Sequence, residues 1–194
     1  YDVSAEAGGC YQSQTQNLVV DGDMELGFIL PHRTDNGMGY TCQPVAFNWV
    51  NADTELDIGY DYSAAQVDLP FVFPYYWALR DTAWVSSSGF LNFKAADGNP
   101  WNEPIPTPST PNAAIYPFWD YLVVDRYGWW GPQSRVRTAT FGEAPNREFV
   151  IEWRNVATCW YCAEYVSFEV ILYEGGDILM QYRDIDENWR EQGG

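Results

Sequence analysis

The sequence predicts an all-β protein: an antiparallel β-sandwich, jelly-roll-like, with a long irregular N-terminal extension. Apolar and polar residues alternate with a period of two in one segment after another, and helical periodicity is almost absent. Clusters of glycine, proline, asparagine and aspartate separate these segments at short intervals. Apolar residues make up 46% of the 194 residues, which is enough for a substantial core. Many short strands joined by such turns are typical of sandwiches and jelly rolls.

The alternating segments are the predicted strands. Each places large apolar side chains on one face, as Phe149, Ile151 and Trp153 do within 147–156. A Gly-Gly turn at 175–176 joins the last two segments, which predicts a hairpin. The candidates are 67–73, two short strands around a turn within 82–93, 147–156, 165–174 and 177–185.

The chain is expected to divide near residue 45. Residues 1–45 are rich in glycine and polar residues, with one apolar strand candidate at 17–20, and hold too few apolar residues for their own core. We expect them to form an extension that packs on a sandwich of residues 46–194. Residues 95–117 hold six prolines and are not expected to form a central strand.

Charge and cysteine content limit the partners and the compartment. The formal net charge of −17 repels phosphate backbones, so no nucleic-acid partner is expected. No run of 18 apolar residues occurs, so no membrane span is expected. The even number of cysteines, four, agrees with an oxidising compartment, and we expect a secreted or cell-surface protein.

Six strand-and-turn segments follow one another in a specific order. They are FNWVNADTELDI (47–58), VDLPFVFPYY (67–76), WVSSSGFLNF (84–93), NAAIYPFWDYL (112–122), REFVIEWRNV (147–156) and VSFEVILYEGGDILMQYRDI (166–185). In this order they resemble a β-sandwich domain of secreted bacterial proteins, which often adjoins subtilisin-like proteases. The chain is also similar, more distantly, to the nidogen-type extracellular domain. The resemblance implies a noncatalytic extracellular module.

The sequence departs from that family where a further glycine-rich turn and strand are expected after residue 185. A sandwich that lacks its last strand exposes an unpaired sheet edge. Either the strand lies in sequence beyond Gly194, or another chain supplies it, which predicts self-assembly. Two smaller departures are the turn Tyr75–Ala78, which replaces a tighter one, and the cysteines of the 158–162 loop.

The loop TCWYC (158–162) connects two predicted strands, not a strand and a helix. Because redox-active C-x-x-C pairs sit at helix N-termini, a disulfide is favoured over a redox pair. Pairing of Cys159 with Cys162 and of Cys10 with Cys42 is preferred on sequence proximity, and the cross-pairings stay open. A Cys159–Cys162 bond is expected to fix the loop and display Trp160 and Tyr161.

Two acidic residues are the alternative catalytic pair. Glu152 and Glu169 lie on consecutive predicted strands, each opposite the apolar face of its strand. Paired carboxylates among aromatic residues are the machinery of glycoside hydrolases. The competing interpretation is that both are solvated and form cross-strand ion pairs.

A short stretch, NLVVDGDMELG (17–27), resembles the N-terminal motif of galactose-binding-like carbohydrate modules. The resemblance implies a structural calcium ion. Asp21, Asp23 and Glu25 supply hard oxygen ligands, on one face if the segment is an extended strand. A second acidic patch joins Asp53, Glu55, Asp57 and Asp61.

Aromatic residues, 18% of the chain, are the remaining functional signal. Exposed rings in loops stack on sugar faces or anchor protein partners. The candidate ligand-binding residues are Trp101, Trp129, Trp130, Trp160 and Tyr161.

These observations together predict a noncatalytic extracellular module that recognises a glycan or an extracellular protein, or assembles with its own copies. The alternatives are a carbohydrate-active hydrolase that uses Glu152 and Glu169, or an accessory domain of a larger secreted protease.

Overall fold

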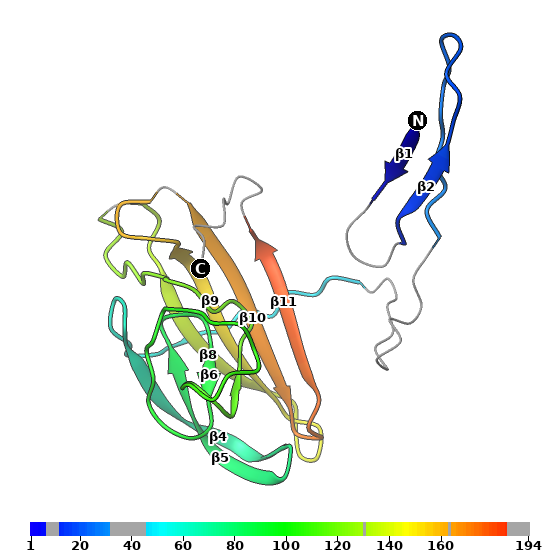
Figure 1. Ribbon diagram of the computed structural model, residues 1–194. Helices are drawn as coiled ribbons and strands as arrows, with labels where there is room; N and C mark the ends of the chain where they lie inside the picture. The colour runs from blue at the N-terminus through cyan, green and yellow to red at the C-terminus, as the bar shows by residue number, and fades with distance from the viewer. Residues whose placement is uncertain (7–11, 32–45, 130, 163, 186–194) are drawn as a thin grey trace. The chain divides into compact units, whose positions relative to one another are not determined.

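The computed structural model describes residues 1–6, 12–31, 46–129, 131–162 and 164–185. The chain divides into two compact units, Tyr1–Phe47 and Asn48–Gly194. Eleven strands and no helix occur in the described residues, and every strand pair is antiparallel. The predicted all-β class is therefore confirmed (Figure 1).

The first unit contains one strand pair, β1 (Asp2–Ala5) and β2 (Gln14–Asn17). Hydroxyl and amide side chains tie the two strands together, for example at 2.8 Å between Ser4 Oγ and Thr15 Oγ1. The strand predicted at 17–20 was wrong, because β2 ends at Asn17 and the apolar residues after it are irregular. None of the described residues of this unit is buried, so no hydrophobic core forms among them.

The second unit consists of two sheets. The larger sheet has the order β11-β10-β9-β8-β3 and the smaller one the order β4-β5-β6-β7. The larger sheet contains β3 (Thr54–Glu55), β8 (Arg135–Phe141), β9 (Glu148–Ala157), β10 (Tyr165–Tyr173) and β11 (Ile178–Asp184). The smaller sheet contains β4 (Ala64–Tyr75), β5 (Ala78–Ser86), β6 (Leu91–Asn92) and β7 (Ala114–Ile115).

One hydrophobic core joins the two sheets face to face. Alternate residues of β4, among them Phe71 and Phe73, pack in the same cluster as Ile151, Trp153 and other residues of the larger sheet. These are the apolar faces that the period-two alternation predicts. The proline-rich segment 95–117 is irregular as expected, except that its residues Ala114–Ile115 form the short β7.

The loops gather at two ends of the sandwich (Figure 1). At one end the β9–β10 connection lies beside the residues that precede β4, since Trp160 hydrogen-bonds Asp61. At the other end the β4–β5 turn lies beside the β10–β11 turn, where Gly176 approaches the Pro74 side chain so closely that a Cβ would lie 2.9 Å from it. The two ends carry separate groups of exposed aromatic residues.

Candidate functional site

Eight aromatic residues from four loops meet at the end of the sandwich that holds the β9–β10 connection. They come from the segments before β4, before β7, between β7 and β8, and between β9 and β10. We call this group the aromatic loop cluster. Its members are Tyr60, Tyr62, Trp101, Tyr121, Tyr127, Trp129, Trp160 and Tyr161.

The carboxylate of Asp61 lies at the centre of the cluster. Its Oδ2 accepts a hydrogen bond of 2.8 Å from the Trp160 indole N–H and one of 3.2 Å from the Tyr121 hydroxyl. Burial, followed by the negative charge of Asp61, raises the pKa of Tyr121 to about 12. The Tyr121 phenol is therefore neutral and donates at any physiological pH. Asp61 thus joins two loops that are far apart in the sequence.

One flank of the cluster is a stack around Tyr60. The ring of Trp129 stacks on Tyr60 at 5.8 Å and on Tyr127 at 4.9 Å between centroids, and Trp160 tilts against Tyr60 at 6.0 Å. Trp129 nevertheless keeps 61% of its surface exposed, and Tyr161 keeps 78%. These rings are fixed by neighbours yet open to a ligand.

The other flank is built on Tyr121. Trp101 stacks on Tyr121 with the ring planes 17° apart, and Tyr62 meets Trp101 edge-on and Tyr121 at a tilt. Trp101 is 64% exposed and Tyr62 is 52% exposed. The two flanks meet at Asp61, between Tyr60 and Tyr62 in the sequence.

Two aromatic residues of the cluster hold an unfavourable backbone conformation. Tyr62 and Tyr161 have φ values of 47° and 66°, in the left-handed region that bulky residues rarely adopt. Such residues cost of order 1–3 kcal/mol each and concentrate at binding sites. The strain agrees with a functional role for these exposed rings.

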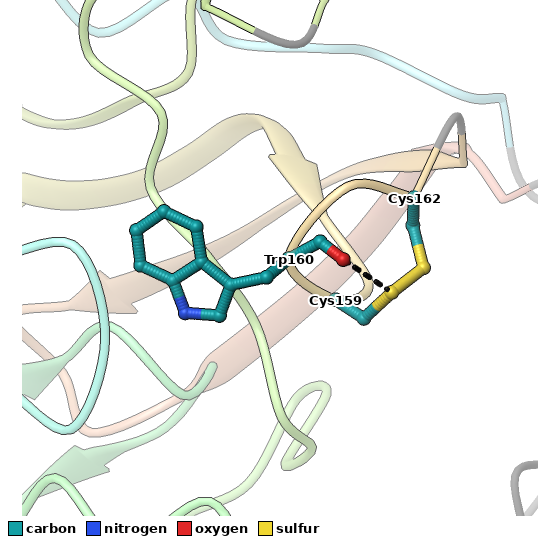
Figure 2. Close-up of a disulfide and its surroundings, with 3 residues drawn as sticks. All are labelled: Cys159, Trp160 and Cys162. Carbon is teal, nitrogen blue, oxygen red and sulfur yellow. Dashed lines mark hydrogen bonds between the residues drawn. A yellow bond between two sulfur atoms is a disulfide. The ribbon is translucent and has the colours of Figure 1, made fainter.

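The predicted disulfide between Cys159 and Cys162 is present, with a Cα–Cα distance of 5.2 Å (Figure 2). Its predicted effect on the two enclosed rings was only half right. Tyr161 is displayed, but Trp160 turns inward to Tyr60 and Asp61 and is only partly exposed. The loop that the disulfide closes therefore exposes the ring of Tyr161 and packs the ring of Trp160 into the cluster. Cys10 and Cys42 lie outside the described residues.

Four of the five candidate ligand-binding residues, Trp101, Trp129, Trp160 and Tyr161, belong to the cluster. Trp130 lies outside the described residues. Tyr60, Tyr62 and Tyr121 were not among the predicted ligand-binding residues, although they belong to the cluster, and Asp61 was assigned only to an acidic patch. The available signal was the stretch GYDY (59–62), in which an acid stands between two aromatic residues just before a strand.

The alternative catalytic pair is buried. Glu152 and Glu169 are directly opposed on β9 and β10, and both are 0% exposed. The expectation that they are solvated was wrong, because the segment 48–52 crosses the outer face of the sheet and covers them. A buried pair lacks the access to substrate that glycoside hydrolysis requires.

The covering segment is held by side chains from three neighbouring strands. The backbone N–H of Asn48 donates to Gln181 Oε1 at 3.3 Å, that of Val50 to Glu169 Oε1 at 3.1 Å, and that of Ala52 to Glu152 Oε2 at 3.2 Å. We call residues 48–52 the strap. Ala52 and Val50 also join a small apolar cluster with the outward-facing Val150 and Ile171.

Of the two glutamates beneath the strap, only Glu152 is paired with a positively charged residue of the described chain. Arg154 pairs with Glu152, its Nε lying 2.6 Å from Oε1. Glu169 accepts hydrogen bonds at Oε1 from Val50 and, at 2.7 Å, from Gln181, while its buried Oε2 has no partner. Burial, and then the charge of Glu152, raise the pKa of Glu169 to about 7.

The calcium ligands predicted at Asp21, Asp23 and Glu25 are exposed and lie in irregular structure, not on the face of a strand. Within the described parts of the chain, no three histidine, cysteine or acidic residues come together as a metal site. In the second acidic patch, Glu55 and Asp57 pair with arginines instead, at 3.0 Å from Arg135 and 2.7 Å from Arg126. Calcium binding stays a prediction that this geometry does not support.

Residues 39–194, most of the chain, match the family described as NIDO related. The chain therefore belongs to the NIDO-related family, which agrees with the resemblance to the nidogen-type domain. No curated protein and no solved structure shows significant similarity to the chain. Across the described residues, no helix is long and apolar enough to cross a membrane.

Proposed function

We propose that this NIDO-related chain is a noncatalytic extracellular module that binds a glycan through the aromatic loop cluster. One observation carries the proposal: exposed rings from four loops are held in fixed orientations around the carboxylate of Asp61. Secretion is part of the proposal, supported by the family relation and by the Cys159–Cys162 disulfide. An association with protease domains stays a prediction.

The arrangement suits a sugar ring for two reasons. Trp101 and Trp129 offer flat, half-exposed faces, against which the C–H face of a sugar stacks. Asp61 uses only Oδ2 for its two hydrogen bonds, so Oδ1 has no partner among the described residues and remains able to accept a bond from a sugar hydroxyl. Because the rings are already stacked on neighbours, little side-chain entropy is lost on binding.

A glycan array of neutral and acidic oligosaccharides, probed with the whole chain, tests this function. The oligosaccharide with the strongest signal is then titrated against the Trp129→Ala and Tyr161→Ala variants. We expect each variant to weaken binding by about tenfold, since a lost stacking contact costs on the order of 1–2 kcal/mol. Trp77→Ala is the control, because Trp77 is more exposed still, at 98%, but lies at the other end of the sandwich.

Absence of any oligosaccharide signal, or equal loss in all three variants, contradicts glycan binding through the cluster. Binding that disappears in Trp77→Ala but persists in Trp129→Ala assigns the recognition to the other end. An EDTA arm of the same titration tests the calcium prediction. Unchanged affinity in EDTA argues against a role for calcium in binding.

The edge strand β11 supports self-assembly as a second candidate function. It pairs with β10 on one side, and no described residue pairs with its other side. Both of its faces expose large apolar side chains, with Leu179, Met180 and Tyr182 each 37–41% exposed. An edge strand of this kind accepts a strand from another chain.

Light scattering over a range of concentrations tests the self-assembly. We expect oligomers that dissociate in a Leu179→Lys variant, since an edge charge opposes strand addition. Leu79→Lys is the control, because Leu79 is more exposed, at 73%, and lies on β5, between β4 and β6 in the smaller sheet. A monodisperse monomer at all concentrations rules the candidate out.

A further inference from the structure

A second group of exposed aromatic residues lies at the opposite end of the sandwich, on the hairpin of β4 and β5. Tyr75 and Ala78 are paired, so the turn consists of only two residues, Tyr76 and Trp77. Tyr76 is 77% exposed and Trp77 is 98% exposed. Two-residue hairpin turns normally use glycine, asparagine or aspartate, so two large rings here are unusual.

The backbone at this place is unfavourable as well. Tyr76 has a φ of 51°, and Ala113, which faces it from the loop before β7, has a φ of 57°. Together with Tyr62 and Tyr161 of the aromatic loop cluster, they make four of the five non-glycine residues with positive φ in the described chain. The strained residues therefore gather at two places, each beside exposed aromatic rings.

Between the hairpin and the loop before β7 lies a pocket of about 450 Å³. We call it the hairpin pocket. Its walls are fixed, because the Tyr75 hydroxyl donates to the Ala114 carbonyl at 2.7 Å and the Tyr116 hydroxyl donates to the Pro111 carbonyl at 2.5 Å. Tyr76, Trp77, Ile105 and Pro106 supply its apolar surface. Its size suits a small molecule.

Arg80 is the one charged residue that lines the hairpin pocket. Its Nε is buried and has no hydrogen-bond partner. Four other arginines of the described chain are each paired with a carboxylate; these are Arg126, Arg135, Arg147 and Arg154. Arg137 and Arg183 also form no ion pair among the described residues, but only Arg80 has a buried guanidinium nitrogen there without an acceptor. The guanidinium is therefore partly desolvated and not neutralised by a carboxylate, which favours an anion in the pocket beside its remaining N–H groups.

We propose that the hairpin pocket binds a small carboxylate attached to a six-membered ring. The carboxylate pairs with the Arg80 guanidinium, and the ring lies against Tyr76 and Trp77. Two sources share this chemistry: an acidic sugar and an aromatic acid. The site is independent of the aromatic loop cluster, which lies at the other end of the sandwich.

Four probes separate the sources and test the charge: glucuronic acid with its neutral counterpart glucose, and phenylacetic acid with phenylacetamide. Binding to the whole chain is followed by NMR, through the indole N–H signal of Trp77. We expect at least one acid to bind about tenfold or more tightly than its neutral counterpart, as a charge-assisted bond to arginine predicts. Preference for glucuronic acid identifies an acidic sugar, and preference for phenylacetic acid identifies an aromatic acid.

The Arg80→Gln variant removes the charge and leaves a shorter, polar side chain. We expect it to abolish the preference for each acid over its neutral counterpart. Arg137→Gln removes an arginine charge from β8, which does not line the pocket, and should leave that preference unchanged. Far-ultraviolet circular dichroism and the thermal midpoint of each variant report whether the fold is retained. Ile105→Ala is a second variant in the pocket wall, at an exposed position, and it keeps the Trp77 signal; we expect it to weaken binding of the preferred acid. The proposal is overturned if neither acid binds, if acid and neutral counterpart bind equally, or if Arg80→Gln retains full selectivity in a folded protein.

Discussion

Glu152 and Glu169 are directly opposed on β9 and β10, and both are fully buried beneath the strap. Each accepts a hydrogen bond from a strap backbone N–H, at 3.2 Å and 3.1 Å. Only Glu152 is neutralised by an arginine, Arg154. The strap is therefore held by two carboxyl groups, of which Glu152 is paired with an arginine and Glu169 is not. The ionisation of Glu169 makes its contribution depend on pH.

The stability of the sandwich should depend on pH through Glu169. Burial raises the pKa of this carboxyl group from 4.5 to about 7, so the folded protein holds a proton that the unfolded chain has released. The contribution of Glu169 to the free energy of unfolding is therefore most favourable below pH 4.5. It falls as pH rises from 4.5 to 7 and is least favourable above pH 7. The shift corresponds to about 3 kcal/mol in the free energy of unfolding.

Other carboxyl groups act in the opposite direction, as Glu174 does, whose pKa is lowered by its hydrogen bond to Arg147. The Glu169→Gln variant isolates the effect. Urea unfolding of wild type and variant at pH 4 and pH 8 should show the variant gaining about 3 kcal/mol relative to wild type at the higher pH. Glu143→Gln, at an exposed turn, should show no such change. A difference between Glu169→Gln and wild type that is constant with pH would falsify the assignment.

The pairing of Glu152 with Arg154 gives a second prediction. Glu152→Ala leaves the Ala52 N–H without its acceptor and Arg154 without its carboxylate, with the Arg154 side chain only 26% exposed. We expect a loss of about 2–3 kcal/mol in the free energy of unfolding, near the lower end for a broken buried pair. Glu152→Gln keeps a side-chain acceptor for the Ala52 N–H, so its free energy of unfolding should fall by less than that of Glu152→Ala.

Glu55→Ala is the matched control for that change. Glu55 also pairs with an arginine, Arg135, but its side chain is 47% exposed. Exposed pairs contribute less than about 1 kcal/mol. Equal losses in Glu55→Ala and Glu152→Ala, measured by urea unfolding, would contradict a special role for the buried pair.

Much of the sandwich was predictable because its strands alternate strictly. In β9 and β10 the residues predicted to face the core, such as Phe149, Trp153 and Phe168, are all at most 5% exposed. The burial of the outer faces of β9 and β10 was not predictable from the same alternation. Alternation normally indicates a solvated outer face, but the strap covers it from about 100 residues upstream, a long-range contact that periodicity does not report.

The candidate site was predictable in part for a related reason. Tryptophans in loops, such as Trp101 and Trp129, stand out because a loop does not require them for a core. Their convergence depends on which loops share an end of the sandwich, and that is set by strand order. Asp61 was assigned to an acidic patch because its partners, Tyr121 and Trp160, are 60 and 99 residues away.

Asp61 should support the aromatic loop cluster through its two hydrogen bonds. Asp61→Ala leaves the Trp160 N–H and the Tyr121 O–H without their acceptor in a partly buried site, which costs about 1–2 kcal/mol. Asp61→Asn keeps a side-chain oxygen and should cost less. The indole N–H signal of Trp160 in NMR should move markedly in Asp61→Ala, whereas that of Trp153, in the core, should not. An unmoved Trp160 signal would contradict the hydrogen bond.

The Cys159–Cys162 disulfide closes a very small loop, so its effect on global stability is limited. A Cys159→Ser, Cys162→Ser double variant should lose about 2 kcal/mol or less, from the loop-closure entropy of so short a ring. The variant changes only these two cysteines, whereas chemical reduction acts on any disulfide in the chain. Peptide mapping of the wild type without reduction should recover residues 159 and 162 linked; a link from either to Cys10 or Cys42 would refute the pairing.

Trp153 should be the most sensitive position of the core. It is fully buried, stacks on Phe168 at 5.0 Å, and donates its indole N–H to the Ser86 carbonyl of the other sheet at 2.9 Å. Trp153→Phe removes that bond between the sheets and leaves a buried carbonyl unpaired, so we expect a loss of about 2–3 kcal/mol. Trp153→Ala adds a cavity and should lose about 3–5 kcal/mol. Trp77→Ala, at 98% exposure, should change the free energy of unfolding by less than about 0.5 kcal/mol. A loss in Trp153→Ala that is no larger than the loss in Trp77→Ala would contradict the central role of Trp153.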